Sequence, residues 1–233
     1  GDVYKRQGYA LYVPRLFKHV HTSVCADQRR ALEVSDIGNL LCETEKASSC
    51  GSLPIELQTT KNIFALMFLL RGIPFVDLAY LRKADIQGNT LKYRRRKTGR
   101  LLTVMLTPDA IKLIRIVAKT KPESPYLFPF LSSPEGTEAA YHEYQSSLRM
   151  FNYRLSRLKK YMKTAAHLSS DTIRHTWATM AYYCEIHPGI ISEAMGHSSI
   201  KVTETYLKPF QNEKIDNANS QVISYVKEYA SIV

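Results

Sequence analysis

The spacing of apolar residues predicts a chain that is mostly helical. Apolar positions recur every three or four residues, which is the period of one face of an α-helix. We expect helices within 35–43, 59–70, 75–86, 109–121, 141–165, 169–186, 188–195, 198–207 and 212–232. The stretch 59–70 is apolar almost all round, so it is predicted to lie at the centre of the core.

Between residues 89 and 108 the apolar residues alternate instead. Leu91, Tyr93 and Arg95 fall on one side of a first strand, and Leu102, Val104 and Leu106 on one side of a second. The sequence Lys97-Thr98-Gly99 between them is typical of a turn, so this segment predicts a β-hairpin with its tip at 97–99. The whole pattern indicates an α+β fold, mostly α, with a small antiparallel sheet packed among helices.

Helix ends and buried faces can also be predicted. Pro108 and Pro188 suit the first turn of a helix, and Gly196 suits the position just after one. The stripe expected to be buried in 169–186 comprises Ile173, Trp177, Ala181 and Cys184. The helix 141–165 carries an apolar stripe and a strongly basic face. Such a face is usually solvated, and it also suits a row of phosphates.

The charge of the chain points to a polyanionic partner. The 233 residues carry a formal net charge of +11, which indicates nucleic acid more than any other partner, although a basic protein without such a partner has the same composition. No apolar run reaches the length of a membrane span. The four cysteines are widely spaced and show no zinc-ligand spacing, so we expect reduced thiols, no structural metal and a cytoplasmic location.

The first seven residues are expected to be foreign to the protein. The segment 2–7, DVYKRQ, back-translates to the end of a sequencing adapter that a transposase inserts. Residues 1–7 are therefore interpreted as an artefact and set aside, and the protein is expected to extend further towards its N-terminus.

One set of side chains suits phosphodiester cleavage without a metal. Such a reaction needs a nucleophile, cations that meet the charge on the phosphate, and an acid for the leaving oxygen. Tyrosine stores the bond energy as a phosphoester, and arginine binds phosphate oxygens in pairs. The sequence offers Arg174 and His175 in TIRHTWAT, His197 and Tyr206 in GHSSIKVTETY, and Lys97 at the hairpin tip. Taken alone, Tyr206 is more often a core aromatic.

These two linked motifs resemble the C-terminal signature of tyrosine recombinases, the phage integrase family. The hairpin KTGRLLTVMLTP resembles the lysine-bearing hairpin of that family, and FVDLAYLRKADI resembles its first helical box. The likeness covers about residues 30–229, and it is greatest to integrases of conjugative and mobilisable transposons of gut anaerobes. It implies that 29–233 is a tyrosine recombinase catalytic domain and that 8–28 is a linker from a missing core-binding domain.

The resemblance also implies a role for each matching residue. Tyr206 is expected to attack the scissile phosphate and form a 3′-phosphotyrosine, while Arg174 holds the phosphate oxygens. Lys97 is expected to protonate the 5′-oxygen, and His197 to bind a phosphate oxygen or assist the tyrosine proton. His175 is expected to be structural. No cofactor and no metal are implied.

Two positions depart from the family pattern. The first catalytic arginine of the family is matched by Pro74, so Arg71 is the expected substitute. A histidine of the family is replaced by Asp171, which is interpreted as a helix N-cap or as a base for Tyr206.

The expected partners are duplex DNA at attachment sites and sister protomers in a synaptic tetramer, in a nucleoid-associated protein with no membrane and no small-molecule substrate. The side chains expected to contact DNA are Arg94, Arg95, Arg96, Arg100, Arg154 and Lys159. The C-terminal helix would dock on a neighbouring protomer through Val222, Ile223 and Val226, or else pack within its own chain.

The function implied is site-specific integration and excision of a mobile element. The alternatives are a decayed integrase that binds DNA without cutting it, or a strand transferase like a type IB topoisomerase. Whether Arg71 reaches the site of Arg174 and Tyr206 separates an active integrase from a decayed one.

Overall fold

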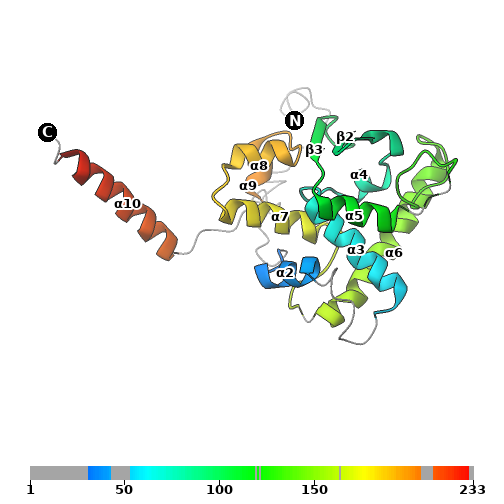
Figure 1. Cartoon of the computed structure of the whole chain (residues 1–233), viewed down its shortest axis with the longest axis horizontal. Coiled ribbons are helices and arrows are strands. Elements are labelled where there is room, and N and C mark those ends of the chain that lie inside the picture. Colours follow the sequence, from blue (N-terminus) through cyan, green and yellow to red (C-terminus); the bar gives the residue numbers. More distant parts are fainter. Residues whose placement is uncertain are drawn as a thin grey trace, which may run out of the picture.

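The computed structural model describes residues 31–42, 53–118, 120, 122–162, 164–205 and 212–230. The helices are α2 (Val34–Cys42), α3 (Ile55–Leu69), α4 (Phe75–Ala79), α5 (Pro108–Val117), α6 (Glu138–Met162), α7 (Thr172–Tyr183), α8 (Pro188–Ala194), α9 (Ile200–Glu204) and α10 (Asn212–Ala230), with a 3₁₀ turn at Lys83–Asp85. The strands are β1 (Ile86–Gln87), β2 (Thr90–Arg94) and β3 (Leu101–Met105). The predicted class, mostly α with a small antiparallel sheet, is confirmed (Figure 1).

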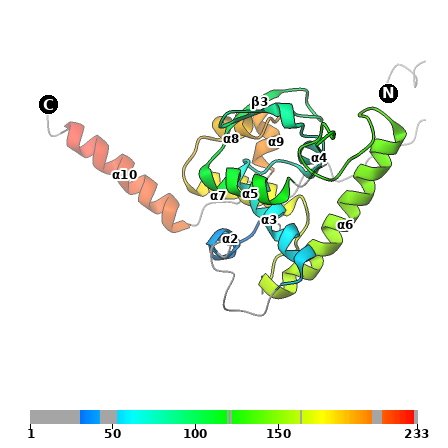
Figure 2. The same cartoon turned by 45° about the vertical axis from the view of Figure 1, so that its right-hand side comes forward.

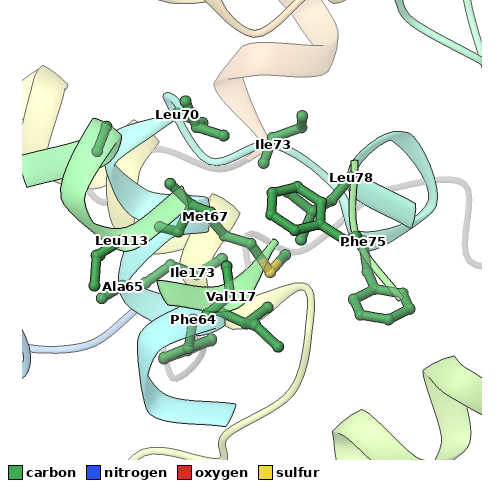
Figure 3. Close-up of a cluster of buried hydrophobic side chains, with 14 of the residues drawn as sticks. Phe64, Ala65, Met67, Leu70, Ile73, Phe75, Leu78, Leu113, Val117 and Ile173 are labelled. Carbon is green, nitrogen blue, oxygen red and sulfur yellow. The ribbon is translucent and has the colours of Figure 1, made fainter. Parts of the chain in front are cut away.

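Helix α3 is the centre of the core, as its apolar sequence predicted. It packs against α5, α6 and α7. Figure 3 shows Phe64, Ala65 and Met67 of α3 gathered with Leu113 and Val117 of α5 and Ile173 of α7. Each large apolar side chain buried in this way stabilises the fold by about 1.5–3 kcal/mol relative to exposure. Because α7 packs on α3, the core fixes the helix that carries Arg174.

The hairpin prediction is confirmed in its alternation and in its tip. Strands β1, β2 and β3 form one antiparallel sheet in that order, with Leu91 opposite Val104 and Tyr93 opposite Leu102. All four of these side chains are buried, because alternate residues of a strand face the same side. The Arg95 N–H donates to the Arg100 carbonyl at 2.8 Å and closes the turn. The short strand β1 was not predicted.

The predicted helix 75–86 is wrong, because it breaks after α4. The backbone of this segment pairs with residues 125–127 instead of continuing the helix: the Lys83 N–H donates to Pro125 O and the Leu127 N–H to Leu81 O. The Asp85 carboxylate then accepts the Arg82 N–H at 2.7 Å, which shapes the 3₁₀ turn. Tertiary pairing therefore overrides the helical periodicity at this point.

The helix ends near the site follow local signals. Pro108 and Pro188 are the first residues of α5 and α8, and Gly196, at φ +65°, follows α8, all as predicted. Helix α6 lies three residues nearer the N-terminus than expected, and it buries Phe151, Leu155 and Leu158. The predicted burial of Cys184 is wrong, because α7 ends before it and its side chain is exposed.

Helix α10 lies apart from the other helices in both views (Figures 1 and 2). Each of its described side chains, from Ile215 to Glu228, is exposed to solvent. Among the described helices, none is both long enough and apolar enough to cross a membrane.

Candidate active site

Arg174 lies at the centre of the candidate site, on the first turn of α7. The residue is only 3% exposed. Its Nη1 donates to the Gly72 carbonyl and its Nη2 to the Met195 carbonyl, each at 2.8 Å. The guanidinium therefore joins the turn that follows α3 to the residue that follows α8.

Gly72 lies directly against α7. Its φ is +66°, and a Cβ at this position would lie 2.9 Å from Arg174 Cα and 3.3 Å from Trp177 Cβ. Only glycine fits here, because both the left-handed backbone and the close approach exclude a side chain. The fit places the turn of residues 71 and 72 against Arg174.

Arg71 is thereby held beside the site. It has a left-handed backbone, with φ 60°, which is uncommon for a residue other than glycine. Its Nη1 donates to the Thr103 carbonyl of β3 at 3.3 Å. Pro74, at the position of the expected family arginine, precedes the first residue of α4. The turn thus brings Arg71 next to the residue whose carbonyl binds Arg174.

His197 meets Arg174 across the site. The imidazole is buried, with 2% of the residue exposed. Its Nε2 lies 2.7 Å from Arg174 Nη2 and its Nδ1 lies 2.7 Å from Thr203 Oγ1. A guanidinium only donates hydrogen bonds, so Nε2 must accept, and the neutral ring then carries its proton on Nδ1 and donates it to Thr203.

Burial, together with the charges of Arg174, Arg95 and Lys97, lowers the pKa of His197 to about 3. Burial is the largest cause, because it disfavours the charged imidazolium. His197 is therefore neutral at physiological pH and has a lone pair on the nitrogen that faces Arg174.

Lys97 stands at the hairpin tip and is exposed. The residues around it bind the segment that follows α8: Thr98 Oγ1 donates to the Gly196 carbonyl at 3.0 Å, and Arg100 Nη1 to the His197 carbonyl at 2.5 Å. Its charge contributes to the low pKa of His197. The hairpin therefore brings Lys97 into the same neighbourhood as Arg174 and His197.

Asp171 immediately precedes α7, but it does not act as the predicted side-chain cap. The carboxylate makes no cap hydrogen bond, and its Oδ2 lies 3.1 Å from the Nε2 of His175, one helical turn away. His175 itself is buried. Tyr206, for which Asp171 was considered as a base, lies outside the described residues.

Helix α9, which precedes Tyr206 in the sequence, contacts His197. Thr203, which accepts the hydrogen bond from His197, lies in α9 and is fully buried. Thr205 is the last described residue before Tyr206. Thr203, which bonds to His197, thus lies three residues before Tyr206 in the sequence.

The hairpin arginines expected to bind DNA divide into two groups. The prediction that Arg95 contacts DNA is wrong. The residue is 7% exposed and its Nε pairs with Asp77 Oδ2 at 3.0 Å, so its guanidinium is not on the surface where a phosphate could bind. Arg94 and Arg96 are exposed. The Arg96 guanidinium lies 3.8 Å from the centre of the Tyr80 ring.

The other three residues expected to contact DNA do not lie on one surface. Arg100 belongs to the hairpin and binds the His197 carbonyl. Arg154 and Lys159 belong to the C-terminal half of α6, and Lys159 Nζ donates to the Ala165 carbonyl at 3.2 Å. In both views that end of α6 lies far from β3 (Figures 1 and 2).

Asp77 is a site residue that the sequence analysis missed. It is 3% exposed, its Oδ1 accepts the Arg96 N–H at 2.9 Å, and its Oδ2 pairs with Arg95. Burial raises the pKa of the Asp77 carboxyl, while the Arg96 N–H and the charges of Arg95 and Arg174 oppose that rise. The sequence signal that could have identified Asp77 is a single carboxylate within an otherwise apolar helix. Such a carboxylate is expected to be buried, and a buried charge is rare without a partner.

Among the described residues, no group of three or more His, Cys, Asp or Glu side chains is placed to hold a metal ion. The groups gathered near Arg174 are instead cationic or neutral: the Arg174 guanidinium bonds to the neutral His197, and the charges of Arg95 and Lys97 act on the same imidazole.

The fold is similar to solved structures of recombinases. XerA recombinase matches with a TM-score of 0.54 and 18% identity, over 82% of this chain and 62% of that one. XerH site-specific recombinase bound to a palindromic difH substrate matches with 0.55 and 16%, over 82% and 52%. The Tn1549 transposon integrase in complex with transposon right end DNA matches with 0.55 and 13%, over 83% and 66%.

The chain thus covers between about half and two thirds of each of these three proteins. No curated protein sequence matches it. The model of the phage integrase family matches residues 37–213, a span that contains the hairpin, Arg174, His197 and Tyr206. The chain belongs to the phage integrase family.

Proposed function

We propose that this chain is the catalytic part of a site-specific DNA recombinase that integrates and excises a mobile element through a 3′-phosphotyrosine. One observation carries the proposal. Arg174 Nη2 and His197 Nε2, which come from two motifs 23 residues apart in sequence, lie 2.7 Å from each other in a buried site. Membership of the phage integrase family supports the same function.

The first chemical step is transfer of the phosphate to tyrosine. The Tyr206 oxygen attacks the scissile phosphorus, and the bond from phosphorus to the 5′-oxygen breaks. Lys97 gives a proton to that oxygen, which leaves as a hydroxyl, and the 3′-phosphate stays on Tyr206. The energy of the broken bond is retained, so a second 5′-hydroxyl can reverse the step on another strand.

His197 is proposed to hold the Arg174 guanidinium in place, and the tyrosine proton is proposed to pass to solvent, because a ring with a pKa of about 3 whose Nε2 already accepts from Arg174 is too weak a base to take it. Its neutral ring has the proton on Nδ1, which leaves the Nε2 lone pair on the side of Arg174. That lone pair accepts the hydrogen bond of the Arg174 guanidinium, which can only donate. Arg174 is then the residue that balances the charge on the non-bridging oxygens.

Arg71 is proposed as the second arginine of the site. Its place beside Gly72, whose carbonyl binds Arg174, supports this role. Asp171 is proposed to orient His175, 3.1 Å away, rather than to act on the DNA. A carboxylate at this point repels phosphate, so pairing with a histidine suits it better.

The proposed partners are duplex DNA and sister protomers. The net charge of +11 suits DNA, and the exposed Arg94, Arg96 and Arg100 of the hairpin, with Arg154 and Lys159 of α6, are the proposed contacts. Helix α10 is proposed to dock on a neighbouring protomer through its exposed Val222, Ile223 and Val226. The protein would then act at the nucleoid, with a core-binding domain outside this sequence.

The test is capture of the covalent intermediate. The purified chain is mixed at low salt with nicked duplexes that carry a randomised central site, where cleavage releases a short fragment and traps the enzyme on DNA. Low salt is used because phosphate contacts dominate affinity. A covalent band on a denaturing gel is expected from the wild type and from Tyr225→Phe, an exposed tyrosine of α10, and no band from Tyr206→Phe. A wild type that binds the pool without forming a band would overturn the proposal in favour of a DNA-binding remnant.

A further inference from the structure

Arg95 differs from its neighbours Arg94 and Arg96 because it points into the protein. It comes two residues before Lys97, yet its guanidinium bonds to two other elements. Nε pairs with Asp77 Oδ2 of α4 at 3.0 Å, and Nη1 donates to Met195 O at 3.1 Å and to Gly196 O at 3.4 Å. A single buried side chain therefore joins the hairpin, α4 and the segment after α8.

The segment after α8 is held along its backbone by the hairpin. Carbonyls of three successive residues accept hydrogen bonds from it: those of Met195 and Gly196 from Arg95, that of Gly196 also from Thr98, and that of His197 from Arg100. A Cβ on Gly196 would lie 3.2 Å from Arg95 Cδ. The Gly196 backbone is thus packed closely against the Arg95 side chain.

The Met195 carbonyl is shared with Arg174, which donates to it from Nη2 at 2.8 Å. Arg95 and Arg174 are therefore fixed against the same oxygen. A displacement of Arg95 would move the hairpin relative to both Arg174 and His197.

Arginine is suited to this position in a way that lysine is not. Its planar guanidinium directs several N–H groups in fixed directions, so one group can bind a carboxylate and carbonyls at once, whereas lysine offers a single ammonium. Asp77 supplies the negative charge that a buried guanidinium requires, because an unpaired charge in the interior is strongly destabilising.

We propose that Arg95 is a positioning residue that fixes the Lys97 hairpin against Arg174 and His197. Its catalytic meaning rests on the proposed function, because Lys97 must meet the leaving oxygen while Arg174 holds the phosphate. Arg95 itself contacts neither DNA nor the reacting atoms.

The first test measures the hairpin without DNA. Hydrogen–deuterium exchange is compared in the wild type, Arg95→Lys, Asp77→Asn and the control Lys92→Arg, whose residue is exposed on the same hairpin. The Arg95 and Gly99 amides, which close the turn, are expected to exchange at least about tenfold faster in the first two variants, since a lost buried hydrogen bond is worth about that factor. Amides of α3 should not change in Arg95→Lys, in which the charge beside Asp77 is kept, whereas in Asp77→Asn they report the loss of global stability. Equal exchange in all four proteins would overturn the proposal.

The second test separates positioning of Lys97 from general damage. Cleavage rates are measured on ordinary DNA and on DNA with sulfur in place of the 5′-bridging oxygen, a leaving group that needs no proton. Arg95→Lys is expected to slow cleavage of ordinary DNA at least about tenfold, or about 1.4 kcal/mol, and to cleave the sulfur substrate within about threefold of wild type, as Lys97→Ala should. An equal loss on both substrates would contradict the proposal. If the wild type cleaves neither, the proposed function fails, and the exchange measurement still decides the role of Arg95.

Discussion

The hairpin site and helix α10 both reverse the usual distribution of side chains, and they do so in opposite senses. Beneath the hairpin, Asp77, Arg95, Arg174 and His197 are charged or polar and are buried. On α10, the apolar side chains Ile215, Val222, Ile223, Tyr225 and Val226 are exposed. Buried polar groups are stable only when they are bonded, and exposed apolar groups gain only when something covers them.

The difference shows where each region finds its partners. In the described part of the hairpin site, each buried charge is bonded to a residue from another element. The apolar face of α10 has no such cover in the described structure, since all of its described side chains are exposed. Substitutions in the site should therefore change stability and chemistry, whereas substitutions on α10 should change association alone.

The largest effect is expected from breaking the buried pair. Asp77→Asn should lower the free energy of unfolding by about 3–5 kcal/mol, because it leaves Arg95 charged, buried and without its carboxylate. Urea denaturation measures this. The matched surface pair is Arg82 with Glu135, 2.6 Å apart and partly exposed, and Arg82→Ala should cost less than about 1 kcal/mol. Similar losses in the two variants would show that burial does not set the strength of these pairs.

Arg174→Lys tests the chemistry of the site. The variant should slow covalent-complex formation by about 10²–10³-fold, since lysine cannot bind two phosphate oxygens in the manner of arginine. Quenched-flow cleavage at saturating protein, corrected for the folded fraction, gives the rate. Lys92→Arg, at an exposed position of the same hairpin, is the control with an unchanged rate. A rate for Arg174→Lys within about threefold of wild type would remove Arg174 from the mechanism.

His197 should make stability depend on pH. Its pKa is about 3 in the folded protein against an ordinary value of 6.5, so the unfolded chain binds the proton more tightly. The contribution of neutral His197 to the free energy of unfolding is fully present above pH 6.5. It is lost as the pH falls towards 3, and the loss reaches about 3 kcal/mol at pH 4. Urea denaturation between pH 7 and 4 should show a shallower pH slope for His197→Gln than for wild type. Identical slopes would mean that His197 is not buried in its neutral form.

Alanine substitutions at Gly72 and Gly88 distinguish the cost of close packing from the cost of a left-handed backbone. Both have positive φ, but a Cβ at Gly72 would meet Arg174 Cα at 2.9 Å, whereas nothing lies within 4 Å at Gly88. Gly88→Ala should cost about 1 kcal/mol from its left-handed backbone alone, and Gly72→Ala about 2 kcal/mol or more because the turn must also move away from α7. Thermal denaturation measures both, and equal costs would contradict the packing of this turn on Arg174.

The smallest effect on stability is expected on α10. Val226→Asp should change the free energy of unfolding by less than about 0.5 kcal/mol, as is usual for an exposed position. It should weaken association of protomers on DNA, which sedimentation measures, while Lys227→Asp on the same helix, which removes no apolar side chain, should weaken it less. A loss of stability above about 1 kcal/mol for Val226→Asp would mean that α10 packs on its own chain.

Much of the fold could be predicted because its elements follow local periodicity. The alternation that turns Leu91 and Tyr93 inward also turns Arg95 inward, so the strand pattern was right where the interpretation from charge, a DNA contact, was wrong. The helix 75–86 was mispredicted because residues 81–83 bond to residues 125–127, and no local pattern contains that pairing.

The site could be predicted only in part, for a related reason. Arg174, His197 and Lys97 belong to recognisable motifs, and the fold brings them together. Asp77 lies in FVDLAYLRKADI, which resembles a family motif, but no role was assigned to it, and its partner Arg95 is 18 residues away in sequence. The need for a partner can be predicted from one buried carboxylate, but the identity of that partner depends on how the hairpin packs.

The central claim is that Tyr206 carries the DNA strand, and the most direct measurement is to locate the adduct. The covalent complex is digested with nuclease and protease, and the peptide that retains a nucleotide is sequenced by mass spectrometry. The account predicts a 3′-phosphonucleotide on the tyrosine of the peptide that contains Tyr206. An adduct on any other residue, or cleaved DNA with no adduct, would contradict it.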